Sequence, residues 1–242
     1  MKREPLPANT SNLSGEELKT LLEQPLCQKG ASRRDEVYTH LLGQMTAGRL
    51  LPGSIVNMNN LCEELSISRT PLREALIRLD AEGAVTIHPR SHIVVNSLTL
   101  EEFHQLYDLI GAIEASLISN AFASYTPQIL DVMRQYNTEM EAALHDDDIL
   151  HFEKMHYKFH HVFLAVSQNT YAERILIPMK NRMWDYPKRS FYKSWYFASV
   201  NEHYEIITLI ERGNREAAAA FMRDTHWGFA FNEPSIRKTY FG

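Results

Sequence analysis

Four histidines in the second half of the chain stand at positions where their imidazoles could meet. His156 and His160 lie four residues apart in a stretch with helical periodicity, so both rings leave the same face of the predicted helix. His203 and His226 each lie on the apolar face of a later predicted helix. A buried imidazole needs a partner, and a divalent metal ion would satisfy several at once. The spacing alone leaves two interpretations open: a metal site, or histidines that are separately hydrogen-bonded in the core.

The elements that would position these histidines are helices within residues 98–232. Thr99 and Glu102, and again Ser199 and Glu202, have the spacing of capping boxes that open helices. Apolar residues recur at helical spacing through this region, and strand patterns are absent from it. The sequence therefore predicts an all-helical bundle, in which His161 would point away from the core.

A second stretch with chemical potential is residues 61–83, which predict a short helix, a tight turn and a second helix. Thr70 can cap this second helix, and its buried face would consist of Leu72, Ala75, Leu76 and Leu79. The opposite face carries arginines. Residues 84–95 then alternate between apolar and polar around a turn at 89–92, which predicts a β-hairpin. A helix-turn-helix followed by a hairpin is the order of a DNA-binding winged helix, although an ordinary amphipathic helix pair is the commoner structure.

Residues 33–97 resemble the GntR family of bacterial transcription regulators. The resemblance is carried by residues 48–53 (GRLLPG), 61–65 (LCEEL) and 68–76 (SRTPLREAL). It implies that operator DNA is contacted from the second helix and from the wing. The residues implied are Ser68, Arg69, Thr70, Arg73, Arg78, Arg90 and His92. His92 stands where the family usually has a glycine at the wing tip.

Composition limits the class of protein. The chain has 242 residues, a net charge of −5 and two cysteines, which give no disulfide framework. It contains neither an apolar run of about 18 residues nor a segment of signal-peptide type, so we expect a cytoplasmic protein with no membrane partner. Residues 33–97 hold seven arginines and seven acids, so DNA affinity would depend on where the arginines point.

The predicted fold is mostly α and has four parts. Residues 1–32 are expected to be a flexible tail, in which Ser14 and Glu17 could open one short helix. Residues 33–97 form the winged helix-turn-helix, with three helices and a small hairpin. The helical bundle of residues 98–232 follows, and residues 233–242 are a C-terminal tail.

The bundle resembles the FCD domain, the helical effector domain of FadR-type GntR regulators. The resemblance implies a metal site formed by His156, His160, His203 and His226, with His156 in place of the family's aspartate. An all-imidazole set suits Zn²⁺ or Ni²⁺ better than Mg²⁺ or Ca²⁺. It would leave the ion's charge uncompensated by protein and so favour an anionic ligand.

The effector pocket departs from the family pattern. Ile110 stands where relatives often place an arginine that grips a ligand carboxylate, and the following Gly111 could widen the pocket. An organic or sugar acid is the expected class of effector. Candidate effector-binding residues are Tyr107, Arg174, Arg182 and Tyr204.

These features together predict a homodimeric transcription regulator and not an enzyme. Two winged helices would bind the half-sites of double-stranded operator DNA, and a small-molecule effector in the bundle would change this binding. The family's common behaviour makes it a repressor that the ligand releases. The alternatives are a regulator that senses the metal directly and a metal-dependent hydrolase. The hydrolase lacks an obvious general base.

Overall fold

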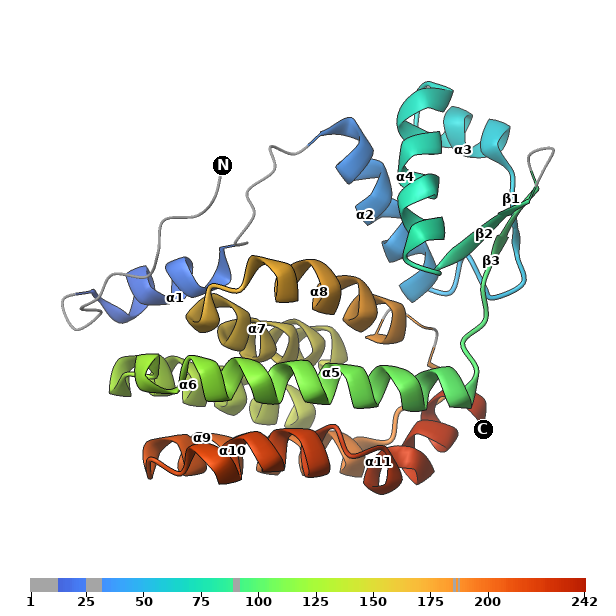
Figure 1. Cartoon of the computed structure of the whole chain (residues 1–242). Helices are drawn as coiled ribbons and strands as arrows, with labels where there is room; N and C mark the ends of the chain where they lie inside the picture. Colours follow the sequence, from blue (N-terminus) through green and yellow to red (C-terminus); the bar gives the residue numbers. More distant parts are fainter. Residues whose placement is uncertain (1–12, 25–31, 89–91, 185, 187) are drawn as a thin grey trace.

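The computed structural model describes residues 13–24, 32–88, 92–184, 186 and 188–242, and within them a winged-helix domain lies above a helical bundle (Figure 1). The predicted fold class is confirmed. The winged-helix elements are α2 (Arg33–Thr46), β1 (Ile55–Val56), α3 (Met58–Glu64), α4 (Arg69–Ala81), β2 (Val85–His88) and β3 (His92–Val95).

The hairpin of the winged helix is completed by a third strand that the sequence did not suggest. The sheet order is β1-β3-β2 and both pairings are antiparallel, with Ile55 opposite Val94 and Val85 opposite Val95. Alternation along β3 buries Ile93 and Val95 against the helices. The apolar face of α4 meets the same core, so the sheet and the second helix of the motif are held together.

Helix α4 begins two residues earlier than the sequence predicted. Ser68 occupies the cap position with extended backbone, and no side-chain hydrogen bond caps the helix. The expectation that Thr70 caps it is therefore wrong, since Thr70 already lies in the first turn and its side chain is exposed. Its hydroxyl stays on the outer surface, beside Arg69 and Arg73.

The helical bundle begins with three long helices: α5 (Leu100–Asn120), α6 (Pro127–His145) and α7 (Ile149–Ser167). The short 3₁₀ turn η2 (Phe122–Ser124) joins the first two. The predicted capping box of Thr99 and Glu102 opens α5, each side chain bonding the other's backbone amide.

The remaining bundle helices are α8 (Thr170–Trp184), α9 (Lys193–Glu211), α10 (Arg215–Phe221) and α11 (Phe229–Ile236), with π-helical turns η3 (Met222–His226) and η4 (Arg237–Phe241). Ser199 and Glu202 do not open a helix, because α9 begins at Lys193 and both lie inside it. This frees Glu202 for a contact described below. None of the helices in the described ranges has the length and apolarity needed to cross a membrane.

Both predicted tails contain packed structure. Helix α1 (Gly15–Glu23) is opened by the capping box of Ser14 and Glu17, and it buries Leu18 and Leu22 in the bundle core. The expectation of a flexible tail is wrong for this helix, because its apolar stripe finds a partner on α6 and α7.

The packing of the N-terminal segment on α7 also contradicts the expectation for His161. This side chain was expected to point away from the core, but it is buried, and its Nε2 lies 3.4 Å from the carbonyl oxygen of Gln24. At the other terminus, Tyr240 in η4 is buried with its ring 4.7 Å from that of Phe103, so the expected C-terminal tail belongs to the bundle core.

Helix α8 is the bundle element nearest to the winged-helix domain (Figure 1). Arg182 of α8 donates a hydrogen bond to the backbone oxygen of Ser97, in the segment that joins the two domains. Beside it, Asn181 and Tyr186 line a small cavity together with Leu42 and Val95 of the winged helix. The two domains therefore meet along the last turn of α8.

Candidate metal centre and nucleic-acid interface

The four predicted histidines converge inside the bundle. His156 and His160 come from α7, His203 from α9 and His226 from η3, and one ring nitrogen of each lies within 4.8 Å of those of the others. The Nε2 atoms of His160 and His226 are 3.2 Å apart. His156 is half-buried and the other three are buried. The structure thus brings together the whole predicted set from three segments of the chain.

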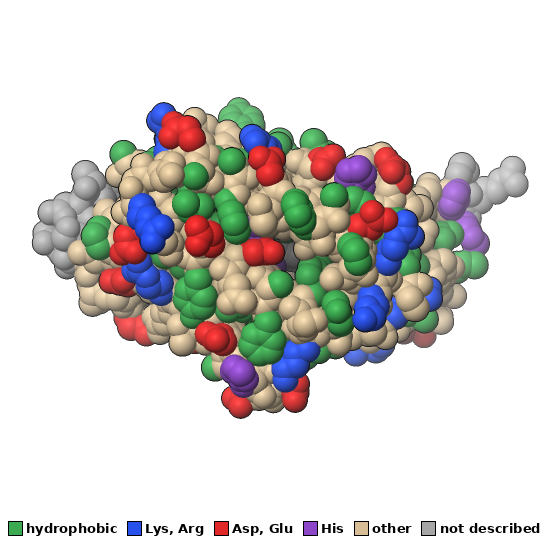
Figure 2. Space-filling view, turned by 90° about the horizontal axis from the view of Figure 1, so that it is seen from below, with side chains coloured by type: hydrophobic (Ala, Val, Ile, Leu, Met, Phe, Trp, Pro, Cys, Tyr) green, Lys and Arg blue, Asp and Glu red, His purple; other side chains and the backbone are tan. Residues whose placement is uncertain are grey.

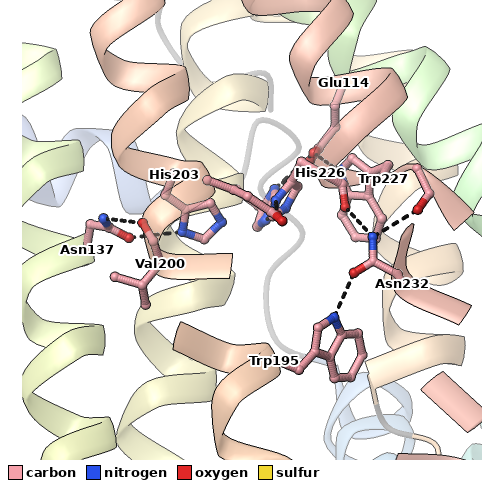
Figure 3. A network of polar contacts seen from close by, with 11 residues as sticks. Glu114, Asn137, Trp195, Val200, His203, His226, Trp227 and Asn232 are labelled. Carbon is pink, nitrogen blue, oxygen red and sulfur yellow. Dashed lines mark hydrogen bonds and ion pairs between the residues drawn. The ribbon is translucent and has the colours of Figure 1, made fainter. Parts of the chain in front are cut away.

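Hydrogen bonds behind three of the rings orient them. His160 places Nδ1 2.9 Å from Glu114, and His226 places Nδ1 2.8 Å from Glu202. His203 places Nδ1 3.0 Å from Oδ1 of Asn137, whose amide group donates to a backbone oxygen of α9 (Figure 3). Because carboxylate and amide oxygens accept, each Nδ1 donates to them, and the Nε2 atom of each ring is directed at the other rings.

The Nε2 atoms face one another, which is the arrangement of a metal site. Nε2 of His203 is buried and has no hydrogen-bond partner among the described residues. Burial, together with the neighbouring basic groups, holds the pKa of His156, His160 and His203 well below the usual value, so these rings are neutral ligands. Metal-bound histidines ordinarily have such acceptors on their other nitrogen. The residues present therefore fit a divalent ion held by imidazole.

Glu114 is the centre of the polar network behind this cluster. Its carboxylate is fully buried and accepts from Nδ1 of His160, from Nζ of Lys180 and, at 2.6 Å, from Nε1 of Trp227 (Figure 3). Burial lowers the pKa of Lys180, while Glu114 acts in the opposite direction. The donors meet both oxygens, so the carboxylate is held in one orientation.

This network corrects the expected charge of the site. The sequence suggested that an all-imidazole set would leave a divalent ion uncompensated. Glu114 and Glu202 instead place carboxylates directly behind His160 and His226, and Lys180 balances part of that negative charge. An ion here would keep a reduced positive charge, still favourable for one anionic ligand.

A cavity of about 180 Å³ opens beside the cluster. His156 and His226 form part of its wall, and the predicted effector residue Tyr107 lines it as well. Gly111 does not widen this cavity: a Cβ there would come within 2.8 Å of Cβ of Trp227, so the glycine permits close packing of α5 against η3. Ile110 is fully buried in the apolar core.

The other three predicted effector residues lie away from this cavity. Arg174 is exposed, with its guanidinium 5.7 Å from the ring centroid of Tyr171. Arg182 bonds the interdomain segment, and Tyr204 bonds Glu141 on the outer side of α6 and α9. Their helices were correctly predicted, but the direction of each side chain depends on long-range packing. The cations near the site are instead Lys180 and Lys188.

The proposed DNA-reading surface is formed by α4 and the sheet. Ser68, Arg69, Thr70 and Arg73 are exposed at the start of α4. Arg69 donates to Asn59 at 2.8 Å. Arg69 and Arg73 also line a groove between α4 and the strands. The geometry suits a helix whose N-terminal residues enter a major groove.

The two remaining wing candidates are placed differently by the structure. His92 is exposed and begins β3, where it pairs with His88 across the hairpin, so it lies in a strand and not in the turn. Arg90 lies outside the described residues. The opposite end of the molecule carries interspersed acidic and basic side chains (Figure 2), so the described residues form no continuous basic surface on that face.

Arg78 is held by contacts within the winged helix. Its guanidinium lies 3.6 Å from the ring centroid of Tyr38 and forms ion pairs with Glu82 at 2.9 Å and Asp35 at 3.5 Å. The side chain of Arg78 points toward Tyr38 and Asp35 of α2, and Glu82 at the end of α4 also holds it. Arg78 therefore fastens α4 to α2 and does not line the groove.

Comparison with known proteins agrees with both domains. Residues 33–95 match the model described as "Bacterial regulatory proteins, gntR family", and residues 105–226 match the FCD domain. An HTH-type transcriptional regulator of Bacillus subtilis, YdhC, is 23% identical over 76% of this chain and 83% of its own length. The Nta operon transcriptional regulator of Aminobacter aminovorans is 28% identical over 71% of this chain and 80% of its own.

A solved structure supports the same fold. That of McbR/YncC from Escherichia coli superposes with a TM-score of 0.66 at 20% identity, and covers 80% of this chain and 95% of that one. The family and these relatives are transcriptional regulators and not enzymes, which excludes the alternative of a metal-dependent hydrolase. The chain belongs to the GntR family of bacterial regulatory proteins, and it is a DNA-binding transcriptional regulator with an FCD domain.

Proposed function

We propose that this regulator is a repressor whose operator binding is weakened by an anionic small molecule, bound beside a divalent metal ion in the bundle. The observation that supports it best is the set of three histidines whose Nδ1 atoms are held by Glu114, Asn137 and Glu202. These bonds turn the Nε2 atoms inward, next to a cavity large enough for a small ligand.

Zn²⁺ or Ni²⁺ is the metal that this donor set favours. Neutral imidazole nitrogens are good ligands for both ions, whereas Mg²⁺ and Ca²⁺ prefer oxygen. A bound ion would polarise and anchor an anionic group of the ligand. The side chains of the chain itself orient the rings, and Glu114 with Glu202 limits the excess positive charge.

The effect of ligand binding on the winged helices would be transmitted through α8. Lys180 bonds the carboxylate behind His160, Asn181 lines the ligand cavity, and Arg182 bonds the segment entering the bundle. In a homodimer, two winged helices must match two operator half-sites, so a small rotation at α8 alters their spacing. The ligand acts only to the extent that it prefers one arrangement. We propose the cytoplasm as the site of action, because the operator DNA lies there.

The hydrogen bonds that join the histidine cluster to α8 also support a second candidate function, direct sensing of the metal. Glu114 joins His160 to Lys180, so filling the cluster could itself alter α8 without an organic ligand. In a metal sensor, operator affinity would follow free Zn²⁺ or Ni²⁺ alone. In the effector-controlled protein, the metal-loaded chain binds DNA and releases it only when an acid is added.

The test uses operator DNA selected in vitro from a random pool with the full chain. The metal content of the wild type and of His203→Ala is measured by elemental analysis, and operator affinity with and without metal by fluorescence anisotropy. We expect the variant to lose metal and ligand response while it keeps its helicity and DNA binding. Normal metal stoichiometry in His203→Ala would exclude this residue from the site.

A further inference from the structure

The walls of the cavity beside the histidine cluster combine aromatic rings with polar side chains. The rings come from α5, α7, α9, η4 and the residue after η3, namely Tyr107, Phe152, Tyr157, Trp195, Tyr196, Trp227 and Tyr240, and the polar groups include Glu153, Asn181, Ser199 and Glu202. Tyr107 and Trp227 meet edge to face at 5.1 Å, and Phe152 and Tyr196 do so at 5.0 Å. A flat ring would be well accommodated among these aromatic side chains, and the polar side chains are available to substituents on it.

One of these walls is rigid. Nε1 of Trp195 donates to Oδ1 of Asn232 at 2.7 Å, and Nδ2 of Asn232 donates to the backbone oxygens of His226 at 3.2 Å and Gly228 at 3.0 Å (Figure 3). The indole is thus tied to the segment that carries a histidine of the cluster. A wall that is ordered before binding lowers the entropic cost of holding a flat ligand.

The size of the cavity sets the size of the ligand. A protein cavity of about 150 Å³ binds one benzene molecule, and this one measures about 180 Å³. It therefore accommodates one six-membered ring with small substituents, and a longer acyl chain or a nucleotide would extend into solvent.

The charged groups of the lining bear on the orientation of a ligand. The lining includes His156 and His226 of the cluster and an ion pair of Lys188 with Glu153, at 2.7 Å. Because Glu153 already balances Lys188, a ligand carboxylate is better placed at the histidines. Near the ion pair, the buried hydroxyl of Tyr196 has no partner among the described residues.

We propose that the effector is a small aromatic carboxylic acid whose carboxylate faces His156 and His226 and whose ring carries a polar substituent that hydrogen-bonds Tyr196. This proposal rests on the proposed function, because it places the ligand beside the same metal. It goes beyond it by naming the ligand class and a residue that distinguishes one ring from another. Tyr196 supplies the donor, since burial raises the pKa of its phenol and keeps it protonated.

The experiment measures binding of six probes to zinc-loaded full chain by quenching of tryptophan fluorescence and by thermal shift. The probes are benzoate, the three hydroxybenzoate isomers, cyclohexanecarboxylate and gluconate, the last two lacking an aromatic ring. We expect benzoate to bind more tightly than either non-aromatic acid. One hydroxybenzoate should bind about tenfold more tightly than benzoate, as one added buried hydrogen bond would give.

Tyr196→Phe should abolish the preference for that hydroxybenzoate and leave benzoate affinity unchanged. Tyr171→Phe is the matched control, because Tyr171 is an exposed tyrosine of α8, distant from the cavity lining. Equal loss for both acids in Tyr196→Phe, or gluconate binding as tightly as benzoate, would overturn the proposal.

The same titrations test the ligand class and the effector control of DNA binding separately. If gluconate binds and releases operator DNA, effector control stands and the aromatic class is wrong. If hydroxybenzoate binds through Tyr196 while operator affinity is unchanged, the ligand class stands and effector control of DNA binding is wrong.

Discussion

The side-chain amide of Asn181 hydrogen-bonds the phenol of Tyr38 and also lines the cavity beside the histidine cluster. Tyr38 belongs to α2 of the winged helix, and its hydroxyl donates to Glu82 at 2.5 Å, just beyond the end of α4. Arg78 of α4 rests on the same ring. One residue of the bundle therefore touches both the cavity beside the histidines and a tyrosine that contacts the DNA-reading helix.

Asn181→Ala should weaken the link between ligand and DNA more than either binding event alone. We expect the ligand-induced change in operator affinity to fall by a factor of about 5 to 10, in the range of single-residue effects on coupling. The measurement is a cycle of four affinities: DNA with and without ligand, and ligand with and without DNA. Arg174→Ala, at an exposed position of the same helix, is the control. An unchanged coupling factor in Asn181→Ala would exclude this route.

Glu114→Gln should reduce metal affinity by about 10- to 100-fold, as loss of a carboxylate behind a ligating histidine commonly does. The change also leaves Lys180 as a buried, unbalanced charge, so the double variant Glu114→Gln/Lys180→Met is needed. The double variant should recover thermal stability and keep the low metal affinity, measured by competition with a chelator. Glu141→Gln, on the outer side of α6, serves as the control. Wild-type metal affinity in the double variant would show that Glu114 only balances Lys180.

Arg73→Ala and Arg78→Ala should separate DNA reading from helix packing. Arg73 is exposed in the groove, so its loss should lower specific operator affinity by about 1 to 3 kcal/mol with little change in stability. Arg78 lies on Tyr38, and its loss should lower the free energy of unfolding by about 0.5 to 1.5 kcal/mol. Anisotropy with selected DNA and urea unfolding distinguish them. Lower operator affinity in Arg78→Ala, with lower stability in Arg73→Ala, would show that Arg78 is the DNA contact.

Leu18→Ala should destabilise the bundle even though it lies near the N-terminus. Leu18 is fully buried in the core, and removing such a side chain costs about 2 to 5 kcal/mol. Thr20→Ala, at an exposed position of α1, should change little. Urea unfolding monitored by circular dichroism gives both values. Equal stability of the two variants would mean that α1 contributes no packing energy in solution.

The sequence was sufficient wherever function depends on local pattern. The helix periodicity of residues 69–81 defined α4, and the i, i+4 spacing of His156 and His160 placed both imidazoles on one face. The resemblance to the FCD domain then joined His203 and His226 to them. These elements need only helical geometry, which fixes neighbours three and four residues apart.

What sequence reasoning missed depends on partners far along the chain. Glu114 and Lys180 meet across 66 residues, and Glu114 and Trp227 across 113. A signal existed: Glu114 lies four residues after the buried Ile110, and Lys180 four after the buried Leu176, so each charge sits on an apolar helix face. A charged residue at such a position must find a partner, although helical periodicity does not identify that partner.

Helix α1 belongs to the bundle although it precedes the winged helix in the sequence. Because α1 packs on α6 and α7 before the chain enters α2, and α5 returns to the same bundle afterwards, the DNA-reading domain is inserted within the effector domain. Gln24 at the outgoing connection lies against His161, and Ser97 at the returning one against Arg182. Both ends of the winged-helix sequence therefore lead into the same bundle, and the second connection is fastened to α8 by Arg182. A displacement within the bundle can thus act on the DNA-reading domain from either end of its sequence.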